Sequence, residues 1–149
     1  MKLKSQRNER SETEISKEIL DGLEMLKIGS FNRINNGAVY DPTIKMFRNK
    51  SHHSPDGLSD IIGCLRGRYG CIEVKTYLEY LKLLKFFDYL LATEQFNKDT
   101  FIITYKPENK WEQRACDQMN FMYGKIKEGG FGFFTFSLQH TLEKLKEIK

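Results

Sequence analysis

Residues 57–75 constrain the fold more than any other stretch, because their pattern predicts a β-hairpin. Two short apolar runs, residues 61–65 and 71–74, flank a segment rich in turn residues at 66–70. Side chains alternate between the two faces of a strand, so each run can present an apolar face to a shared core. The stretch therefore predicts two antiparallel strands with one buried face.

Three charged residues fall on the opposite face of this predicted hairpin. Glu73 and Lys75 project away from the core, because Ile72 and Val74 project toward it. Asp60 must join them, since a slip of one residue would move its side chain to the wrong face. Two carboxylates and an ammonium group are thus predicted to converge on neighbouring strands.

This combination of charges points to a metal site. Two carboxylates held close repel each other unless a cation lies between them, and carboxylate oxygens suit hard ions such as Mg²⁺ or Mn²⁺. Lys75 would then orient a water or stabilise charge on a phosphate. The alternative is an edge hairpin whose Glu73 and Lys75 are solvated, since Glu-x-Lys alone is common on strands. The spacing of 12 residues between Asp60 and Glu73, with turn residues between, is more specific.

Several motifs occur in a recognisable order along the chain. A helix opening at Glu14-Ile15 and a strand-like segment at 33–37 precede Gly57-Leu58-Ser59-Asp60 and Ile72-Glu73-Val74-Lys75, and Gln118-Met119-Asn120-Phe121 and Gly129-Gly130 follow. In this order they resemble the PD-(D/E)xK nuclease superfamily, and within it the VRR-NUC type of phage and DNA-repair proteins. Ser59 stands where that family usually has proline. The 42 residues between Lys75 and Gln118 replace a short loop, so we expect an insertion at about 76–110.

The resemblance implies an α/β fold with a restriction-endonuclease-like core: a mixed β-sheet flanked by helices, with an inserted helix and strand after the catalytic hairpin. It also implies a Mg²⁺- or Mn²⁺-dependent DNA endonuclease whose cut leaves a 5′-phosphate. Asp60, Glu73, the Val74 carbonyl and Glu14 through water would hold the metal. Lys75 would position the attacking water, and Gln118 would point at the site.

Two of these residues have a second interpretation. Ser11-x-x-Glu14 is a capping box that predicts a helix to about Lys27, so Glu14 is either the cap partner or the helix-borne carboxylate of the site, with Glu18 as the alternate. Gln118 borders the buried face of a predicted helix at 111–127. Its amide either hydrogen-bonds to backbone or faces the metal site.

A polar, basic loop directly before the hairpin is the predicted phosphate-binding segment; a solvated loop is the alternative. We expect DNA contacts from this loop and from the hairpin turn, with the residues Lys45, Arg48, Lys50, His52, His53, Arg66 and Arg68. Asp56 is the fallback metal ligand. The net charge of +4 permits binding to a polyanion but does not require it.

The length of 149 residues suits one domain, which we expect at 11–149 behind a flexible basic arm at 1–10. No apolar run is long enough to span a membrane, and no signal peptide is expected. Three cysteines, an odd number, indicate reduced thiols and a cytoplasmic location, in a bacterium or a phage-infected cell.

A predicted helix at 76–96 is apolar around much of its circumference. We expect either a homodimer that resolves branched DNA such as a Holliday junction, with contacts from Leu83, Phe87 and Leu90, or a cover formed by the predicted strand at 101–105 and the helix at 111–127. A strand at 131–136 and a helix at 138–148 complete the prediction. Two rival functions remain open: a non-catalytic DNA-binding or assembly module that keeps the nuclease fold, and a ribonuclease.

Overall fold

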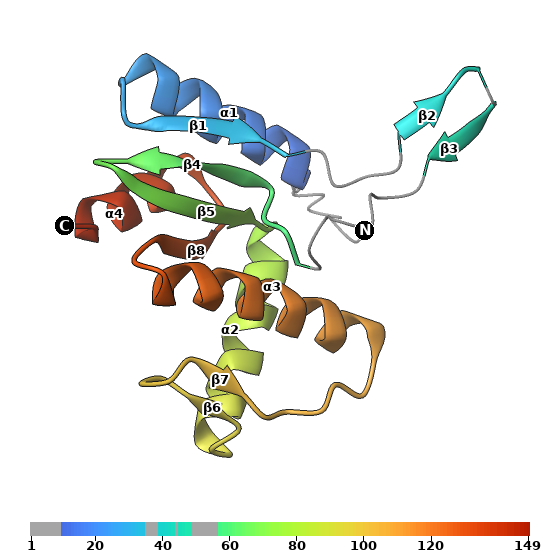
Figure 1. Cartoon of the computed structure of the whole chain (residues 1–149), viewed down its shortest axis with the longest axis vertical. Coiled ribbons are helices and arrows are strands. Elements are labelled where there is room, and N and C mark those ends of the chain that lie inside the picture. Colours follow the sequence, from blue (N-terminus) through green and yellow to red (C-terminus); the bar gives the residue numbers. More distant parts are fainter. Residues whose placement is uncertain (1–9, 35–38, 44, 49–56) are drawn as a thin grey trace, which may run out of the picture.

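The computed structural model describes residues 10–34, 39–43, 45–48 and 57–149 (Figure 1). Its helices are α1 (Glu12–Met25), α2 (Tyr77–Ala92), α3 (Lys110–Lys127) and α4 (Leu138–Glu147). Its strands are β1 (Ser30–Arg33), β2 (Val39–Asp41), β3 (Met46–Arg48), β4 (Ile61–Leu65), β5 (Arg68–Val74), β6 (Phe96–Asn97), β7 (Ile102–Ile103) and β8 (Phe131–Thr135).

The main sheet is mixed, with the strand order β1-β4-β5-β8. β1, β4 and β5 pair antiparallel, whereas β8 lies parallel to β5. A parallel pair needs a crossover connection, and this one contains α2, the small β6–β7 sheet and α3. The pairs β2–β3 and β6–β7 form separate two-stranded sheets.

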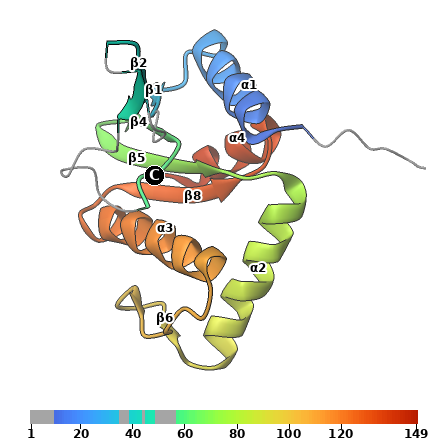
Figure 2. The same ribbon diagram turned by 90° about the vertical axis from the view of Figure 1, so that its right-hand side faces the viewer.

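Helices cover both faces of the main sheet (Figure 2). α1 and α4 pack on one face, where Ile19 and Leu145 join a buried cluster with Ile72 of β5. α2 and α3 lie on the other, where Leu90 and Met119 belong to a second cluster. The predicted α/β architecture, a mixed sheet flanked by helices, is confirmed at this level.

The predicted hairpin is also confirmed. β4 and β5 pair with Ile61 opposite Ile72, and both side chains are buried in the cluster under α1. The turn is shorter than predicted, because β5 begins at Arg68 and only Arg66 and Gly67 connect the strands. Both turn residues have positive φ, 52° and 77°, as the tight turns that match the twist of a hairpin require.

The insertion after β5 differs in detail from the prediction. The predicted helix at 76–96 ends at Ala92, and the predicted strand at 101–105 shrinks to the two residues of β7, which pair with β6 and not with the main sheet. The β6–β7 pair and α3 together bury one side of α2. Leu83 and Leu90 are only 5% and 0% exposed, so the prediction that they form a dimer contact is wrong.

Phe87, the third predicted dimer residue, is half-buried and lies with its ring centroid 5.1 Å from that of Phe96. Cover within one chain therefore accounts for the apolar face that prompted the dimer. Large apolar side chains of α2 that stay exposed lie elsewhere on the helix, at Tyr77, Leu78, Leu84 and Tyr89. The homodimer itself stays a prediction.

Smaller differences concern the first third of the chain. α1 ends at Met25, before the predicted end at Lys27. The chain on either side of the predicted strand-like segment at 33–37 contributes to two different sheets, through β1 and β2. Most of the predicted arm lies outside the described residues, whereas Arg10 is described and pairs with Glu18. Among the described residues, no helix is long and apolar enough to cross a membrane.

Candidate functional site

Asp60 lies directly before β4, beside the end of β5. Its Oδ2 accepts a hydrogen bond from the backbone N–H of Val74 at 2.9 Å, and its carbonyl accepts one from the N–H of Ile34 at 2.7 Å. One step beyond the Ile61–Ile72 pair, the register brings Asp60 opposite Glu73. The convergence predicted from strand alternation is thus present.

Glu73 is the most buried charged side chain of the site, at 1% exposure. Its Oε1 accepts hydrogen bonds from Lys75 Nζ at 3.0 Å and from Gln118 Nε2. Its Oε2 is buried and has no hydrogen-bond partner among the described residues. A buried polar atom without a partner is costly, so a cation or water bound at this oxygen would offset that cost.

Burial and the neighbouring Asp60 raise the pKa of Glu73 from its ordinary value of 4.5 to about 8, against the opposing positive charges of Lys75 and Arg114. At neutral pH and with no further cation, this carboxyl is therefore mostly protonated. A divalent cation would favour the ionised form. The raised pKa of Glu73 is thus compatible with a carboxylate that ionises when a metal binds.

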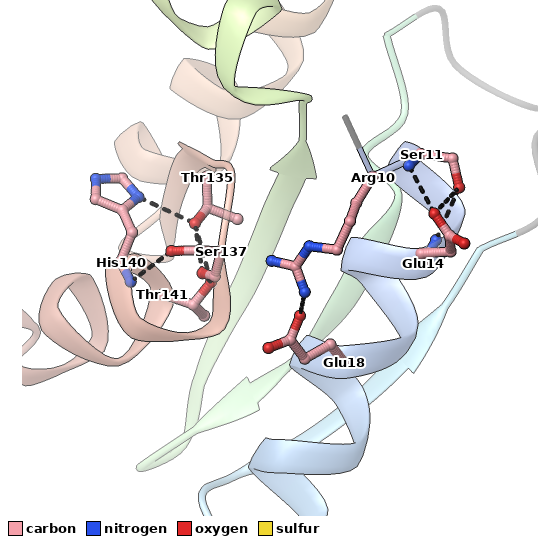
Figure 3. A network of polar contacts seen from close by, with 8 residues as sticks. All are labelled: Arg10, Ser11, Glu14, Glu18, Thr135, Ser137, His140 and Thr141. Atoms are coloured by element: carbon pink, nitrogen blue, oxygen red, sulfur yellow. Dashed lines mark hydrogen bonds and ion pairs between the residues drawn. The ribbon is translucent and has the colours of Figure 1, made fainter. Parts of the chain in front are cut away.

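Lys75 follows the end of β5 and is 5% exposed. Its backbone N–H donates to the Thr135 carbonyl of β8 at 2.8 Å. Thr135 is itself fixed, because its Oγ1 lies 3.0 Å from both Thr141 Oγ1 and His140 Nδ1 (Figure 3). Sequence reasoning missed this network, which holds the strand that positions Lys75.

Gln118 enters the site from α3, as one of its two predicted interpretations requires. It is 5% exposed, and its amide hydrogen-bonds to Glu73 and to no backbone group of the described residues. Gly57, with φ +74°, packs against α3 so closely that a Cβ there would overlap the Asp117 carbonyl. The loop that carries Asp60 is therefore held against the helix that carries Gln118.

Glu14 does not reach the site, which corrects one prediction. The structure places it in the capping box of α1, where its side chain accepts from the backbone N–H of Ser11 at 2.8 Å (Figure 3). Glu18, the alternate, pairs with Arg10. The cap interpretation, which the Ser11-x-x-Glu14 pattern carries by itself, describes Glu14 fully.

Glu12, the first residue of α1, lies where Glu14 was expected. It lines a pocket with Lys75 and Gln118, and burial, with Asp60 and Glu79 nearby, raises its pKa although Lys75 and Arg114 oppose the rise. Two residues along a helix turn a side chain by about 200°, so Glu12 and Glu14 face opposite ways. The two-residue offset could not be read from the sequence, because the motif order that suggested a helix-borne carboxylate pointed to Glu14-Ile15.

The predicted DNA-binding residues divide into three groups. Arg66 and Arg68 are committed within the chain, and donate to backbone carbonyls at Ile148, Gly129, Gly130 and Lys149. Their predicted role at a DNA surface stays a prediction, because Arg66 is exposed and these internal bonds do not exclude a phosphate contact. Lys45 is exposed, and Arg48 is the last residue of β3. Lys50, His52 and His53 lie outside the described residues, as does Asp56.

Oxygen donors are what the site offers to a metal. Within the described part of the chain, no group of three or more His, Cys, Asp and Glu side chains converges closely enough to hold a metal ion. The carboxylate pair of Asp60 and Glu73, with one unpaired oxygen, nevertheless fits Mg²⁺ or Mn²⁺, because Mg²⁺ usually keeps several waters and takes only one or two carboxylates from the protein.

Comparison of the chain with protein-family models, with curated proteins and with solved structures gives no match.

Proposed function

We propose that this protein is a Mg²⁺- or Mn²⁺-dependent endonuclease that hydrolyses DNA phosphodiester bonds on a restriction-endonuclease-like core. One observation carries the proposal: the buried Glu73 binds Lys75 and Gln118 through one oxygen, and its other oxygen, opposite Asp60, has no partner in the described part of the chain. The resemblance of the motif order to the VRR-NUC nucleases of the PD-(D/E)xK superfamily supports the same conclusion.

Asp60 and Glu73 would hold the metal, with the Val74 carbonyl and, through water, Glu12 in place of Glu14. When bound, such an ion supplies a water of lowered pKa and neutralises charge on the phosphate. The Val74 N–H keeps Asp60 in place, and the two donors on Oε1 of Glu73 orient its free oxygen. Gln118 therefore acts on Glu73 as a positioning residue.

Lys75 would do the remaining chemistry through its ammonium group. Its burial keeps the Nζ close to Glu73, and a pocket opens next to it. From there the ammonium group can orient the attacking water and stabilise the charge that develops on the phosphate. A binding module would have no need for a buried glutamate next to an aspartate and a buried lysine, which favours catalysis over the non-catalytic alternative.

The proposed substrate is branched DNA such as a four-way junction, cut by a homodimer. The test incubates the purified protein with labelled linear, flapped and four-way-junction DNA and with an RNA duplex, in Mg²⁺, Mn²⁺, Ca²⁺ or excess chelator. We expect cleavage of DNA in Mg²⁺ and Mn²⁺, little in Ca²⁺ and none in chelator. Cleavage of RNA alone would support the ribonuclease alternative, and binding of DNA without cleavage would support the non-catalytic module.

A further inference from the structure

A pocket of about 120 Å³ adjoins the side chains of Lys75 and Gln118 in the proposed site. It lies between the starts of three helices, and Asp60 is not among its lining residues. By the same measure a water molecule needs roughly 10–15 Å³, so the pocket has room for several waters or for one phosphate group. Its lining includes Lys75 and Gln118 of the site, the acidic Glu12 and Glu79, and Trp111 and Arg114 of α3.

Arg114 is the residue of this pocket that the fold does not explain. It lies on the second turn of α3, where the helix dipole gives no reason for a cation. It is exposed, and no hydrogen bond or ion pair joins it to another described residue. Glu12 and Glu79, in contrast, stand in the first turns of α1 and α2, where acidic side chains offset the dipole.

The guanidinium of Arg114 nevertheless lies within electrostatic reach of the proposed site. Arg114 lines the pocket together with Glu12, Lys75 and Gln118, and its positive charge acts on the carboxyl groups of Glu12 and Glu73. Arg114 is also one helical turn before Gln118, so the two side chains project from the same side of α3. Its charge is therefore directed toward the place where a substrate phosphate would react.

Trp111 lines the same pocket, and its ring contacts a second cation. Lys82 Nζ lies 4.1 Å from the centroid of the indole ring, and the ring of Phe86 packs edge-on at 5.4 Å. Two exposed cationic side chains are thus associated with this pocket: Arg114 lines it with Lys75, and Lys82 lies over the ring of Trp111, which also lines it. Cationic side chains beside a hydrolytic site favour the binding of a nucleic-acid phosphate backbone.

We propose that this pocket holds a backbone phosphate of the DNA strand next to the scissile phosphate, and that Arg114 contacts it. The assignment rests on the proposed function. The guanidinium fork matches two phosphate oxygens at once, and Lys75 and Gln118 belong both to the pocket and to the site. Glu12 and Glu79 weaken the binding of a free phosphate ion, so the pocket takes a phosphate that a longer strand delivers.

The test removes the charge from either side of this contact. In a DNA substrate with a mapped cleavage position, the phosphates around the cut are replaced one at a time by uncharged methylphosphonate. Wild type is compared with Arg114→Gln, Arg114→Lys and Lys127→Gln, an exposed cation at the far end of α3 that serves as the matched control. Cleavage is followed in Mg²⁺, and DNA affinity is measured in Ca²⁺ by fluorescence anisotropy.

For wild type and the Lys127 variant, we expect one neighbouring methylphosphonate to lower affinity and cleavage rate by about 10-fold, since a charge-assisted hydrogen bond is lost. On unmodified DNA, Arg114→Gln should show the same loss of affinity and cleavage rate relative to wild type. The neighbouring methylphosphonate should lower neither quantity further for this variant. Arg114→Lys, which keeps the charge without the fork, should fall between. Matching thermal unfolding curves confirm that the variants fold.

The inference is overturned if wild type cleaves DNA and every methylphosphonate affects Arg114→Gln as much as it affects wild type. In that outcome the proposed function stands. If wild type cleaves no DNA in any of the metals, the proposed function fails, and the assignment of the pocket fails with it.

Discussion

The backbone N–H of Val74 donates a hydrogen bond to Oδ2 of Asp60 across 2.9 Å, and so ties the loop before β4 to the end of β5. The bond keeps an acidic side chain beside the buried Glu73, although the two carboxylates repel each other. A structural bond to the backbone thus maintains an arrangement that electrostatics alone would disfavour.

Two replacements of Asp60 distinguish the effect of its hydrogen bond with Val74 from the effect of its charge. Asp60→Asn keeps an oxygen that can accept from Val74 but removes the charge, so we expect loss of cleavage and of metal binding with an unchanged fold. Asp60→Ala should lose activity and also about 1 kcal/mol of unfolding free energy, since the Val74 N–H loses its partner. Cleavage assays, Mn²⁺ calorimetry and urea unfolding measure the three effects. Unaltered Mn²⁺ affinity in Asp60→Asn would refute the ligand role.

The pKa of Glu73 predicts how stability depends on pH in the absence of metal. Because the pKa rises from 4.5 to about 8 on folding, the folded state binds more protons between these values. The contribution of this group to the free energy of unfolding is therefore fully present below pH 4.5 and is lost as the pH rises through about 8. A bound cation favours the ionised form and should reduce that loss.

Urea unfolding at pH 5 to 8 in chelator, repeated in Mn²⁺, measures this effect. Glu73→Gln is the matched control: its carbonyl oxygen can still accept from Lys75, but it cannot titrate. We expect the stability of wild type to fall more steeply with pH than that of the variant, and Mn²⁺ to stabilise wild type most at the alkaline end. Parallel curves for the two proteins would show that Glu73 keeps an ordinary pKa.

Glu12 and Glu14 form a matched pair on one helix. Glu12→Gln should lower the cleavage rate by about 10–100-fold, as the loss of an outer-sphere partner of a metal site usually does. Glu14→Gln should leave the rate unchanged and weaken only the cap of α1, because Glu14 contacts Ser11 and not the site. Steady-state cleavage and thermal melts separate the two effects. The reverse ranking would return the site role to Glu14.

Gly57 and Gly67 test the contact between the Asp60 loop and α3. Both have positive φ, +74° and +77°, so alanine strains the backbone similarly at each. Only at Gly57 does a Cβ meet the backbone of Asp117 and Gln118, whereas nothing lies within 4 Å at Gly67. We expect Gly57→Ala to cost more stability and to reduce cleavage, and Gly67→Ala to cost about 1 kcal/mol with normal activity. Equal effects in melts and cleavage assays would dismiss the contact.

The strand pattern of the hairpin was sufficient to predict how Asp60, Glu73 and Lys75 meet. Side-chain alternation is a local property, and the apolar residues Ile61 and Ile72 left one register that buries both. The periodicity of its helix placed Gln118 at the border of the buried face, and the resemblance supplied the one of two interpretations in which it points at the site. These predictions succeeded because each needed only the strand or helix in which the residue lies, together with its pairing partner.

Other features depend on contacts between distant segments, which a single sequence does not reveal. Arg66 and Arg68 looked like surface cations of a turn, but the chain end and the loop before β8 supply carbonyls for them. Leu83 and Leu90 were predicted to be surplus apolar surface, whereas in the structure they are buried in a cluster with residues of α3. In both cases the partner lies dozens of residues away in the sequence. Composition and periodicity therefore identified a cationic or an apolar side chain but could not identify the segment that it contacts.

The initial rate of DNA cleavage in Mg²⁺, compared between wild type and Lys75→Met, tests the central claim most directly. Lys75 donates to Glu73 within the chain and would act on the phosphate, and methionine fills a similar volume without the charge. We expect wild type to cleave, chelator to stop it, and the variant to lose at least about 100-fold in rate while Mn²⁺ calorimetry still detects binding. A variant that cleaves as fast as wild type, or a wild-type rate that excess chelator leaves unchanged, would contradict the proposed metal-dependent mechanism.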